Sequence, residues 1–197
     1  IKPGYVKYKD ISGPDGVPDG KVDANYDRCI LGTTTPKFYY GLNINATYKG
    51  FDFSALLQGL GGHHRLIGSY MAYAFYGQIQ KWQVENRWTA ENPNKWAEYP
   101  RLETLNGGDP NLQTSDYWVR NASFLRIKNV QLGYSLPRSV ISKIGLSAAR
   151  IYVSCENLHN FTSFYTGWDP ENEIGTGDSP SYYPINRIYS FGLSLNF

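Results

Sequence analysis

Three aspartates in an oxygen-rich loop have a spacing that could bind a metal ion. Asp15, Asp19 and Asp23 recur every four residues, and Gly20 follows the middle one. Calcium loops combine carboxylates with a turn-forming glycine at comparable spacing, because Ca²⁺ takes about six to eight oxygen ligands. The closing position holds Tyr26 instead of glutamate. The loop therefore predicts either a calcium site or, as the alternative, Asx-turns in which each carboxylate binds nearby backbone.

A second group of acids could in principle hydrolyse a glycan. Asp169, Glu171 and Glu173 alternate along the chain. Glycoside hydrolysis needs two carboxyl groups with different roles, one an acid and the other a base or nucleophile. Nothing in the sequence separates these carboxylates into such roles, and no nucleophile elbow or phosphate-binding loop is present. A glycan-active enzyme is the weakest functional hypothesis, and we expect that the chain is not an enzyme.

Aromatic side chains are the most abundant candidate binding groups. They make up 16% of the 197 residues, and 17 of them are tyrosines. Tryptophan and tyrosine can stack on sugar rings or fill pockets of a partner protein. The candidates in stretches without strand periodicity are Trp82, Trp88, Trp96, Tyr165 and Trp168. The alternative for each ring is that it packs within its own loop.

Composition excludes several classes of protein. A net charge of +2, with scattered lysines and arginines, does not predict a nucleic-acid surface. The longest apolar runs cover only a few residues, so the sequence predicts no transmembrane helix. Cys29 and Cys155 lie far apart, and we expect them to be unpaired, with a disulfide as the alternative.

The elements that must position these groups are strands with a two-residue period. From Tyr189 to Phe197, aromatic and leucine side chains alternate with serine, glycine and asparagine. One face of such a strand is apolar and the other has little bulk, as in the wall of an outer-membrane barrel. The distance between the two terminal aromatics corresponds to roughly 20 Å of rise, close to the apolar band of such a barrel. The strand also resembles a barrel-insertion signal, through Tyr189, Gly192, Leu195 and Phe197.

The same alternation recurs upstream. The predicted strands span residues 38–49, 51–59, 122–136, 148–157 and 187–197. A tight turn at Lys49–Gly50 predicts a hairpin. The apolar residues change parity near Lys128–Asn129, which predicts a β-bulge. After Pro137, residues 139–145 predict a single helical turn that ends at Gly145.

Three long stretches, 1–37, 60–121 and 158–186, interrupt the strands. Within the second, helical spacing predicts one helix over residues 71–87. Short turns on one side and long loops on the other are typical of a membrane barrel, so the long stretches are predicted to be extracellular. Five strands cannot close a barrel. The sequence therefore predicts an all-β fold, in which antiparallel transmembrane strands form the C-terminal portion of a large barrel.

Several segments resemble, in order, the SusC/RagA type of TonB-dependent outer-membrane transporter. They are Tyr8-Lys9-Asp10, Asp19-Gly20-Lys21-Val22-Asp23, Lys49-Gly50-Phe51-Asp52-Phe53, Trp88-Thr89-Ala90-Glu91-Asn92-Pro93, Tyr99-Pro100-Arg101-Leu102, the run 115–134, Arg150-Ile151-Tyr152-Val153, Glu156-Asn157-Leu158, Trp168-Asp169-Pro170-Glu171 and Tyr183-Pro184. The resemblance covers nearly the whole chain, and the run from Ser115 to Tyr134 is specific.

The resemblance implies a large barrel in outer-membrane lipid, filled by an N-terminal plug. The family imports oligosaccharides or peptides, takes energy from the TonB–ExbB–ExbD system, and pairs with a SusD-like surface lipoprotein that acts as a lid. The plug, the TonB-contacting segment and most strands are absent from these residues, so we expect them to be encoded upstream. The acidic loop here is longer than the family's compact form, which argues against calcium, so we expect no cofactor, with calcium in this loop as the alternative.

A different class of protein fits part of the pattern. A soluble β-sandwich that binds carbohydrate would also have alternating strands and aromatic loops. The two hypotheses differ in where the apolar strand faces lie. A sandwich would bury Leu42, Ile44, Leu193 and Leu195 between two sheets, whereas a barrel would turn them toward lipid.

Overall fold

A computed structural model describes residues 2–68, 72–76, 79–103, 110–172 and 185–197. The chain forms two compact units. In their described parts, unit 1 comprises residues 2–34, 64–103 and 110–120, without the gaps at 69–71 and 77–78, and unit 2 comprises residues 35–63, 121–172 and 185–197.

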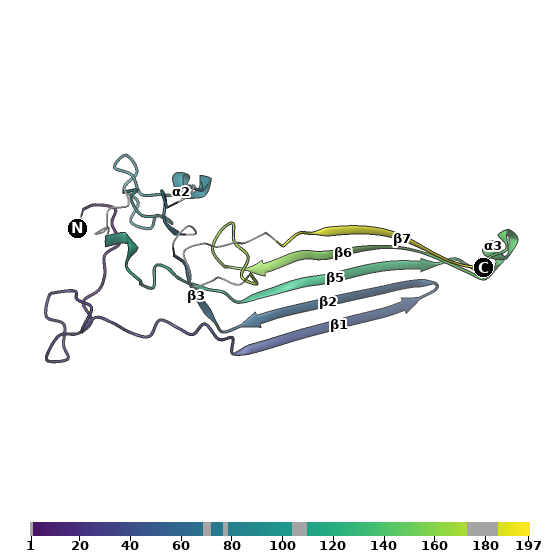
Figure 1. Cartoon of the computed structure of the whole chain (residues 1–197), viewed down its shortest axis with the longest axis horizontal. Coiled ribbons are helices and arrows are strands. Elements are labelled where there is room, and N and C mark those ends of the chain that lie inside the picture. Colours follow the sequence, from purple (N-terminus) through teal and green to yellow (C-terminus); the bar gives the residue numbers. More distant parts are fainter. Residues whose placement is uncertain (1, 69–71, 77–78, 104–109, 173–184) are drawn as a thin grey trace. The chain divides into compact units, whose positions relative to one another are not determined.

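Unit 2 is a five-stranded antiparallel sheet with the order β1-β2-β5-β6-β7 (Figure 1). Its strands are β1 (Phe38–Tyr48), β2 (Phe51–Gly61), β5 (Phe124–Ser135), β6 (Ala148–Thr162) and β7 (Ile188–Asn196). The all-β fold class is confirmed. Strand β6 extends five residues beyond the predicted end at residue 157, because Asn157 has a φ of 52° and interrupts the alternation without ending the pairing.

The register gives the sheet two distinct faces. On the apolar face, Leu42 pairs with Leu57, Leu132 with Val153, and Ile151 with Leu193. The exposed fractions are 56% for Leu42, 42% for Ile44, 57% for Leu193 and 41% for Leu195. These side chains are therefore not buried together between stacked sheets, and the sandwich arrangement is not the one that the chain adopts.

The predicted hairpin and bulge are both present. Lys49 and Gly50 have φ values of 46° and 88°, as a two-residue hairpin turn with the twist of the strands requires. The register of β5 shifts between Ile127 and Asn129 against both of its neighbours, which confirms the bulge. The two side chains that flank the shift thus lie on opposite faces.

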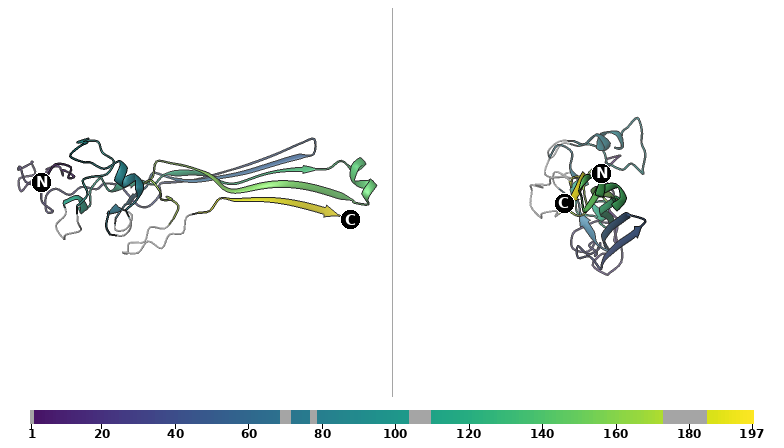
Figure 2. Two further views of the ribbon diagram at one scale, coloured as in Figure 1. Left: turned by 90° about the horizontal axis from the view of Figure 1, so that it is seen from above. Right: turned by 90° about the vertical axis from the view of Figure 1, so that its right-hand side faces the viewer.

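A short helical connection joins β5 to β6. It consists of α3 (Arg138–Ile141) and the 3-10 helix η2 (Ser142–Ile144), and Gly145 caps it in the left-handed conformation with a φ of 76°. The predicted helical turn is confirmed. Figure 2 shows α3 at the end of the sheet where β7 ends, and the Lys49–Gly50 turn lies at the same end in Figure 1.

Unit 1 has little regular structure and an aromatic core. It contains β3 (His64–Leu66) paired with β4 (Val119–Asn121), α2 (Lys81–Glu85) and the 3-10 helix η1 (Pro110–Leu112). Trp118 is 1% exposed, and its ring lies 5.5 Å from that of Tyr73 and 6.1 Å from that of Tyr99. The Tyr99 hydroxyl donates to the carbonyl of Ala72 at 2.7 Å.

The helix predicted over residues 71–87 is wrong in extent. In the described part of this range, Ala72 and Lys81–Glu85 of α2 are helical, while Phe75 has a φ of 69°, a conformation that does not occur within a helix. Residues 71, 77 and 78 lie outside the described residues. The apolar spacing that suggested a helix instead reflects side chains such as Ala72 and Ala74, which are buried in the core of unit 1.

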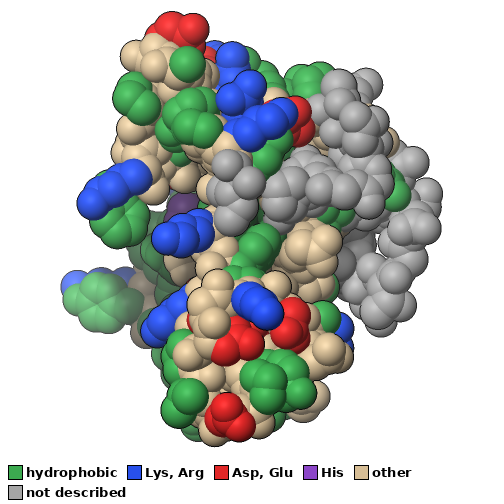
Figure 3. Space-filling model, turned by 90° about the vertical axis from the view of Figure 1, so that its left-hand side faces the viewer, with side chains coloured by type: hydrophobic (Ala, Val, Ile, Leu, Met, Phe, Trp, Pro, Cys, Tyr) green, Lys and Arg blue, Asp and Glu red, His purple; other side chains and the backbone are tan. Residues whose placement is uncertain are grey.

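Among the described residues, no helix is both long enough and apolar enough to cross a membrane. The basic side chains of the described residues show no single cluster on one face of the structure (Figure 3). On the face drawn in Figure 3, lysines and arginines are spread among apolar and polar side chains instead of gathering in one basic patch.

Candidate functional site: a loop held on the polar face of the sheet

A buried arginine lies on the polar face of the sheet. Arg126 of β5 pairs in register with Gln58 of β2 and Asn160 of β6. Because Gln58 and Asp52 share one face of the uninterrupted strand β2, Arg126 lies on the same face as Asp52. Only 3% of Arg126 is exposed. A buried guanidinium needs acidic partners, and the loop after β6 provides them.

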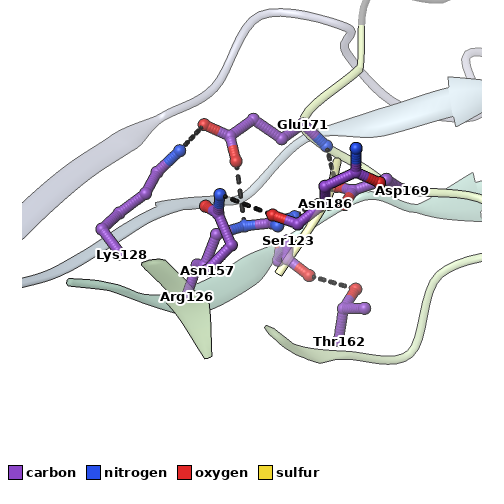
Figure 4. A network of polar contacts seen from close by, with 8 residues as sticks. All are labelled: Ser123, Arg126, Lys128, Asn157, Thr162, Asp169, Glu171 and Asn186. Carbon is purple, nitrogen blue, oxygen red and sulfur yellow. Dashed lines mark hydrogen bonds and ion pairs between the residues drawn. The ribbon is translucent and has the colours of Figure 1, made fainter. Parts of the chain in front are cut away.

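Two carboxylates from that loop reach the β5 wall (Figure 4). Arg126 forms an ion pair with Asp169 at 2.5 Å, and its Nε lies 2.9 Å from Oε2 of Glu171. The other carboxylate oxygen of Glu171 accepts from Lys128. We call these four residues the loop clamp. Its two cations and two carboxylates balance, so it adds no net charge to the polar face.

Apolar contacts accompany the loop clamp. Phe124, two residues before Arg126 on the same face, is 4% exposed, and the loop residues Phe164 and Tyr165 are 8% and 5% exposed. Pro170 is also fully buried. The amide of Trp168 donates to the carbonyl of Tyr165 at 3.1 Å, so residues 165–168 form a tight turn. The loop therefore contributes buried apolar side chains as well as the two acids of the loop clamp.

A second ion pair crosses the polar face near the opposite end of the strands. Arg150 of β6 donates through Nε to Asp52 of β2 at 2.9 Å, over the intervening strand β5. Gly133 of β5 makes this crossing possible, since a Cβ there would lie 2.6 Å from Oδ1 of Asp52 and would overlap the guanidinium of Arg150. Both charged side chains keep about 30% of their surface exposed.

The five predicted binding aromatics differ in their accessibility. Trp96 is 79% exposed, with Nζ of Lys95 4.9 Å from its ring centroid. Trp82 packs edge-on against Tyr99 at 6.0 Å, and Trp88 lies over Gly4, where a Cβ would overlap its ring. In unit 2, Tyr165 is buried and Trp168 is partly buried. Trp96 is thus the most accessible of the five, and binding by any of them stays a prediction.

The acidic loop is organised by hydrogen bonds to its own backbone. Asp19 accepts from the amide of Lys21, and Asp23 accepts from the amides of Asn25 and Tyr26. These are Asx-turns, the alternative to a metal site. Among the described residues, no group of three or more His, Cys, Asp or Glu side chains could hold a metal ion, so Asp15, Asp19 and Asp23 are not gathered as ligands. Calcium binding stays an untested prediction.

Asp27 is the central carboxylate of this loop. It accepts from the amides of Ile11 at 2.7 Å, Asp23 at 2.8 Å and Ser12 at 3.2 Å. Hydrogen bonds from the amides of Asp23 and Ile11 hold the pKa of Asp27 below its ordinary value, because they favour the charged carboxylate. Amides from two parts of the loop, residues 11–12 and residue 23, therefore converge on one carboxylate.

The predicted insertion residues lie on or next to β7. Tyr189 and Leu195 belong to the apolar face and are 68% and 41% exposed, and Phe197 is 93% exposed. Gly192 lies on the polar face opposite Tyr152, and a Cβ there would overlap the Tyr152 ring. This contact gives Gly192 a structural role. A role of the four residues in membrane insertion stays a prediction.

Sequence reasoning missed the charged residues of the polar face. Arg126 and Lys128 are two residues apart in a strand, and Asp169 and Glu171 are two residues apart in a loop. Unpaired charges on a barrel wall cost free energy, so they need partners of opposite charge. The equal spacing of the two cations and the two acids could therefore have predicted that they pair. Glu173, the third acid considered for catalysis, lies outside the described residues. The cysteines were predicted correctly, since Cys29 and Cys155 are both free.

Known proteins resemble the chain along nearly its whole length. TonB-dependent receptors P3 and P26 of Formosa agariphila are 29% and 30% identical to it in alignments that cover 99% and 98% of the chain. The TonB-dependent receptor SusC of Bacteroides thetaiotaomicron is 31% identical in an alignment that covers 91% of the chain. The matches span 19%, 20% and 17% of these relatives, so the chain covers about a fifth of their length.

Solved structures resemble the chain in the same way. The RagAB peptide importer in the open-open state matches with a TM-score of 0.64 and 27% identity, over 93% of the chain and 20% of the importer chain. In the closed-closed state the TM-score is 0.67, over 94% of the chain and 20% of the importer chain. No family model matches the chain.

Three observations now agree. The sheet is antiparallel with one exposed apolar face, its sequence matches TonB-dependent receptors, and its backbone matches RagAB. The chain belongs to the SusC/RagA-type TonB-dependent transporters of the bacterial outer membrane, and its strands are part of their β-barrel.

Proposed function

We propose that the transporter to which this chain contributes imports oligosaccharides or peptides across the outer membrane. The observation that carries the proposal is the two-faced sheet, whose apolar side chains are exposed while its polar face holds charges in pairs. In an outer-membrane barrel the first face meets lipid and the second lines the interior. The relatives named SusC and the RagAB peptide importer support uptake of nutrients as the function of this barrel.

Energy and a lid would come from other proteins. We expect the TonB–ExbB–ExbD system to act through parts of the transporter outside these residues. A SusD-like lipoprotein would cover the outer opening, and the description of RagAB in open-open and closed-closed states supports a partner that opens and closes. Trp96 is the side chain that we expect to contact this lipoprotein or the solute, because it is large, apolar and 79% exposed.

An enzyme finds no support in the contacts of the candidate acids. Both carboxylate oxygens of Glu171 face cations, one at Arg126 and one at Lys128, and Asp169 is paired with Arg126. A catalytic acid or base must reach its substrate, whereas these carboxylates are already engaged by cations of the sheet. The relatives are transporters.

Growth of the native bacterium tests the proposal. A strain without the transporter gene should lose growth on one class of nutrient, either an oligosaccharide or a peptide, and regain it with the full-length gene. Unimpaired growth on all such nutrients would contradict import. For the lid, Trp96→Ala should reduce co-purification of the lipoprotein or lower solute affinity, whereas Glu91→Ala, at an exposed position of the same loop, is the control and should leave both unchanged.

A further inference from the structure

We infer that the turn of residues 165–168 projects from the barrel wall into the channel and limits the size of solute that can pass. The limit on solute size rests on the proposed import function, whereas the position of the turn does not. Two features carry the inference. The loop clamp attaches this loop to the polar face, and the side chains at the tip of the turn stay exposed.

The polar face is the interior face of the barrel. The opposite face consists of apolar side chains along all five strands and belongs to the lipid. Arg126 shares its face with Asp52, as the register through β2 shows. Its partners Asp169 and Glu171 must therefore approach the wall from the inside. The loop that carries them lies within the channel instead of extending away from the membrane.

The loop is held firmly in this position. Arg126 is almost completely buried under Asp169 and Glu171, and Glu171 makes a further ion pair with Lys128. The amide of Glu171 also donates to Asp169 at 3.0 Å, which fixes the two acids relative to each other. Detachment of the loop would take both acids from Arg126 and leave this cation without a partner, so the attached state is favoured.

The tip of the turn has the chemistry of a size limit. Thr166 and Gly167 are exposed, whereas Tyr165 on one side is buried. Neither tip residue is charged, and the charges of the loop clamp cancel. The turn therefore does not select solutes by their charge. It selects them by size, because it narrows the channel.

Thiol labelling tests the position of the turn without any transport. In the purified full-length transporter with Cys29→Ser and any other accessible cysteine replaced, Thr166→Cys should react with a small maleimide and be protected from a large polyethylene-glycol maleimide. Asn94→Cys, on an exposed loop of unit 1, is the matched control and should react with both reagents. Equal reaction of Thr166→Cys with both reagents would overturn the inference.

A second variant tests the attachment. Adding Asp169→Asn and Glu171→Gln to Thr166→Cys removes both carboxylate charges, and the large reagent should then gain access as the loop leaves the wall. Continued protection would show that the loop clamp does not hold the turn. The sizes of the side chains change little, so altered access would report the loss of charge.

Uptake of an oligomer series tests the size limit. In cells with the full-length transporter, Thr166→Trp should cause loss of uptake of the longest solutes while the shortest are still imported, and Thr114→Trp on an exposed part of unit 1 is the control. Equal loss for all lengths, or no loss, would overturn the size limit. Absence of uptake in the unmodified transporter would instead refute the proposed function and leave the labelling result intact.

Discussion

The two ionic clusters of the polar face differ in what they connect. The loop clamp joins a loop to a strand, and its arginine is 3% exposed. The Asp52–Arg150 pair joins two strands across a third, and its side chains are 31% and 28% exposed. A buried pair is costly to break because a desolvated charge is left behind, whereas water can replace an exposed partner. Pairs of arginine and acid therefore hold a loop at one end of the sheet, where they are buried, and add little to the stability of strand pairing at the other end, where they are exposed.

The comparison predicts that the largest effect comes from removing the buried cation. In Arg126→Met, Asp169 and Glu171 lose a buried partner, and breaking such a pair costs on the order of 3 kcal/mol. We expect the loop to open more often, so that the amides of Trp168 and Glu171, which are hydrogen-bonded within the loop, exchange faster. Hydrogen exchange in the full-length transporter measures this change. Arg150→Met is the control and should leave these two amides unchanged, and slow exchange in Arg126→Met would contradict the role of the clamp.

The second cluster should be disturbed more by bulk than by loss of charge. In Gly133→Val the new side chain occupies the space through which Arg150 reaches Asp52, and overpacking of this kind costs about 2 kcal/mol. We expect a lower midpoint in the urea unfolding of the barrel. Gly41→Val provides the matched control on the same face, because the nearest atom to its Cβ, the carbonyl oxygen of Leu57, lies at an ordinary 3.7 Å. Equal midpoints for the two variants would show that the space over Gly133 is not required.

The two clusters also show what could be predicted from the sequence. Strand alternation is local, so the hairpin at Lys49–Gly50 and the bulge near Lys128 were predictable from neighbouring residues. The loop clamp depends on residues 43 positions apart, and that contact exists only because the chain returns across the sheet. Unit 1 was less predictable still. Its rings, such as Trp118, are buried without any periodic spacing, so the alternation that revealed the strands gave no sign of this core.

Removing the charge of the exposed pair should have a small effect. In Asp52→Asn the ion pair with Arg150 becomes a neutral hydrogen bond on a partly exposed surface, and exposed ion pairs contribute little to stability. The unfolding midpoint should fall slightly at low salt, and high salt should abolish the difference from the unmodified protein because ions screen exposed charges. Differential unfolding at two salt concentrations measures this. A loss of unfolding free energy on the order of 3 kcal/mol, the cost expected for Arg126→Met, would mean that exposure does not distinguish the two clusters.

The smallest expected effect concerns Asp27, whose partners are backbone amides, whereas the acids of the two clusters are paired with cations. Asp27 has a pKa below its ordinary value of 3.8, because the amides of Asp23 and Ile11 favour its charged form. A group with a lowered folded-state pKa contributes stability that is present above the ordinary pKa and is lost as the pH falls through the lowered one. The amides of Ile11 and Asp23 should therefore stay protected from hydrogen exchange at about pH 5, and lose protection only below the ordinary pKa, when exchange is normalised to an unstructured peptide. In Asp27→Asn, which carries no charge at any pH, this pH dependence should disappear. If the pH dependence persisted in Asp27→Asn, another acid of the loop would be responsible, and the hydrogen bonds to Asp27 would not be its cause.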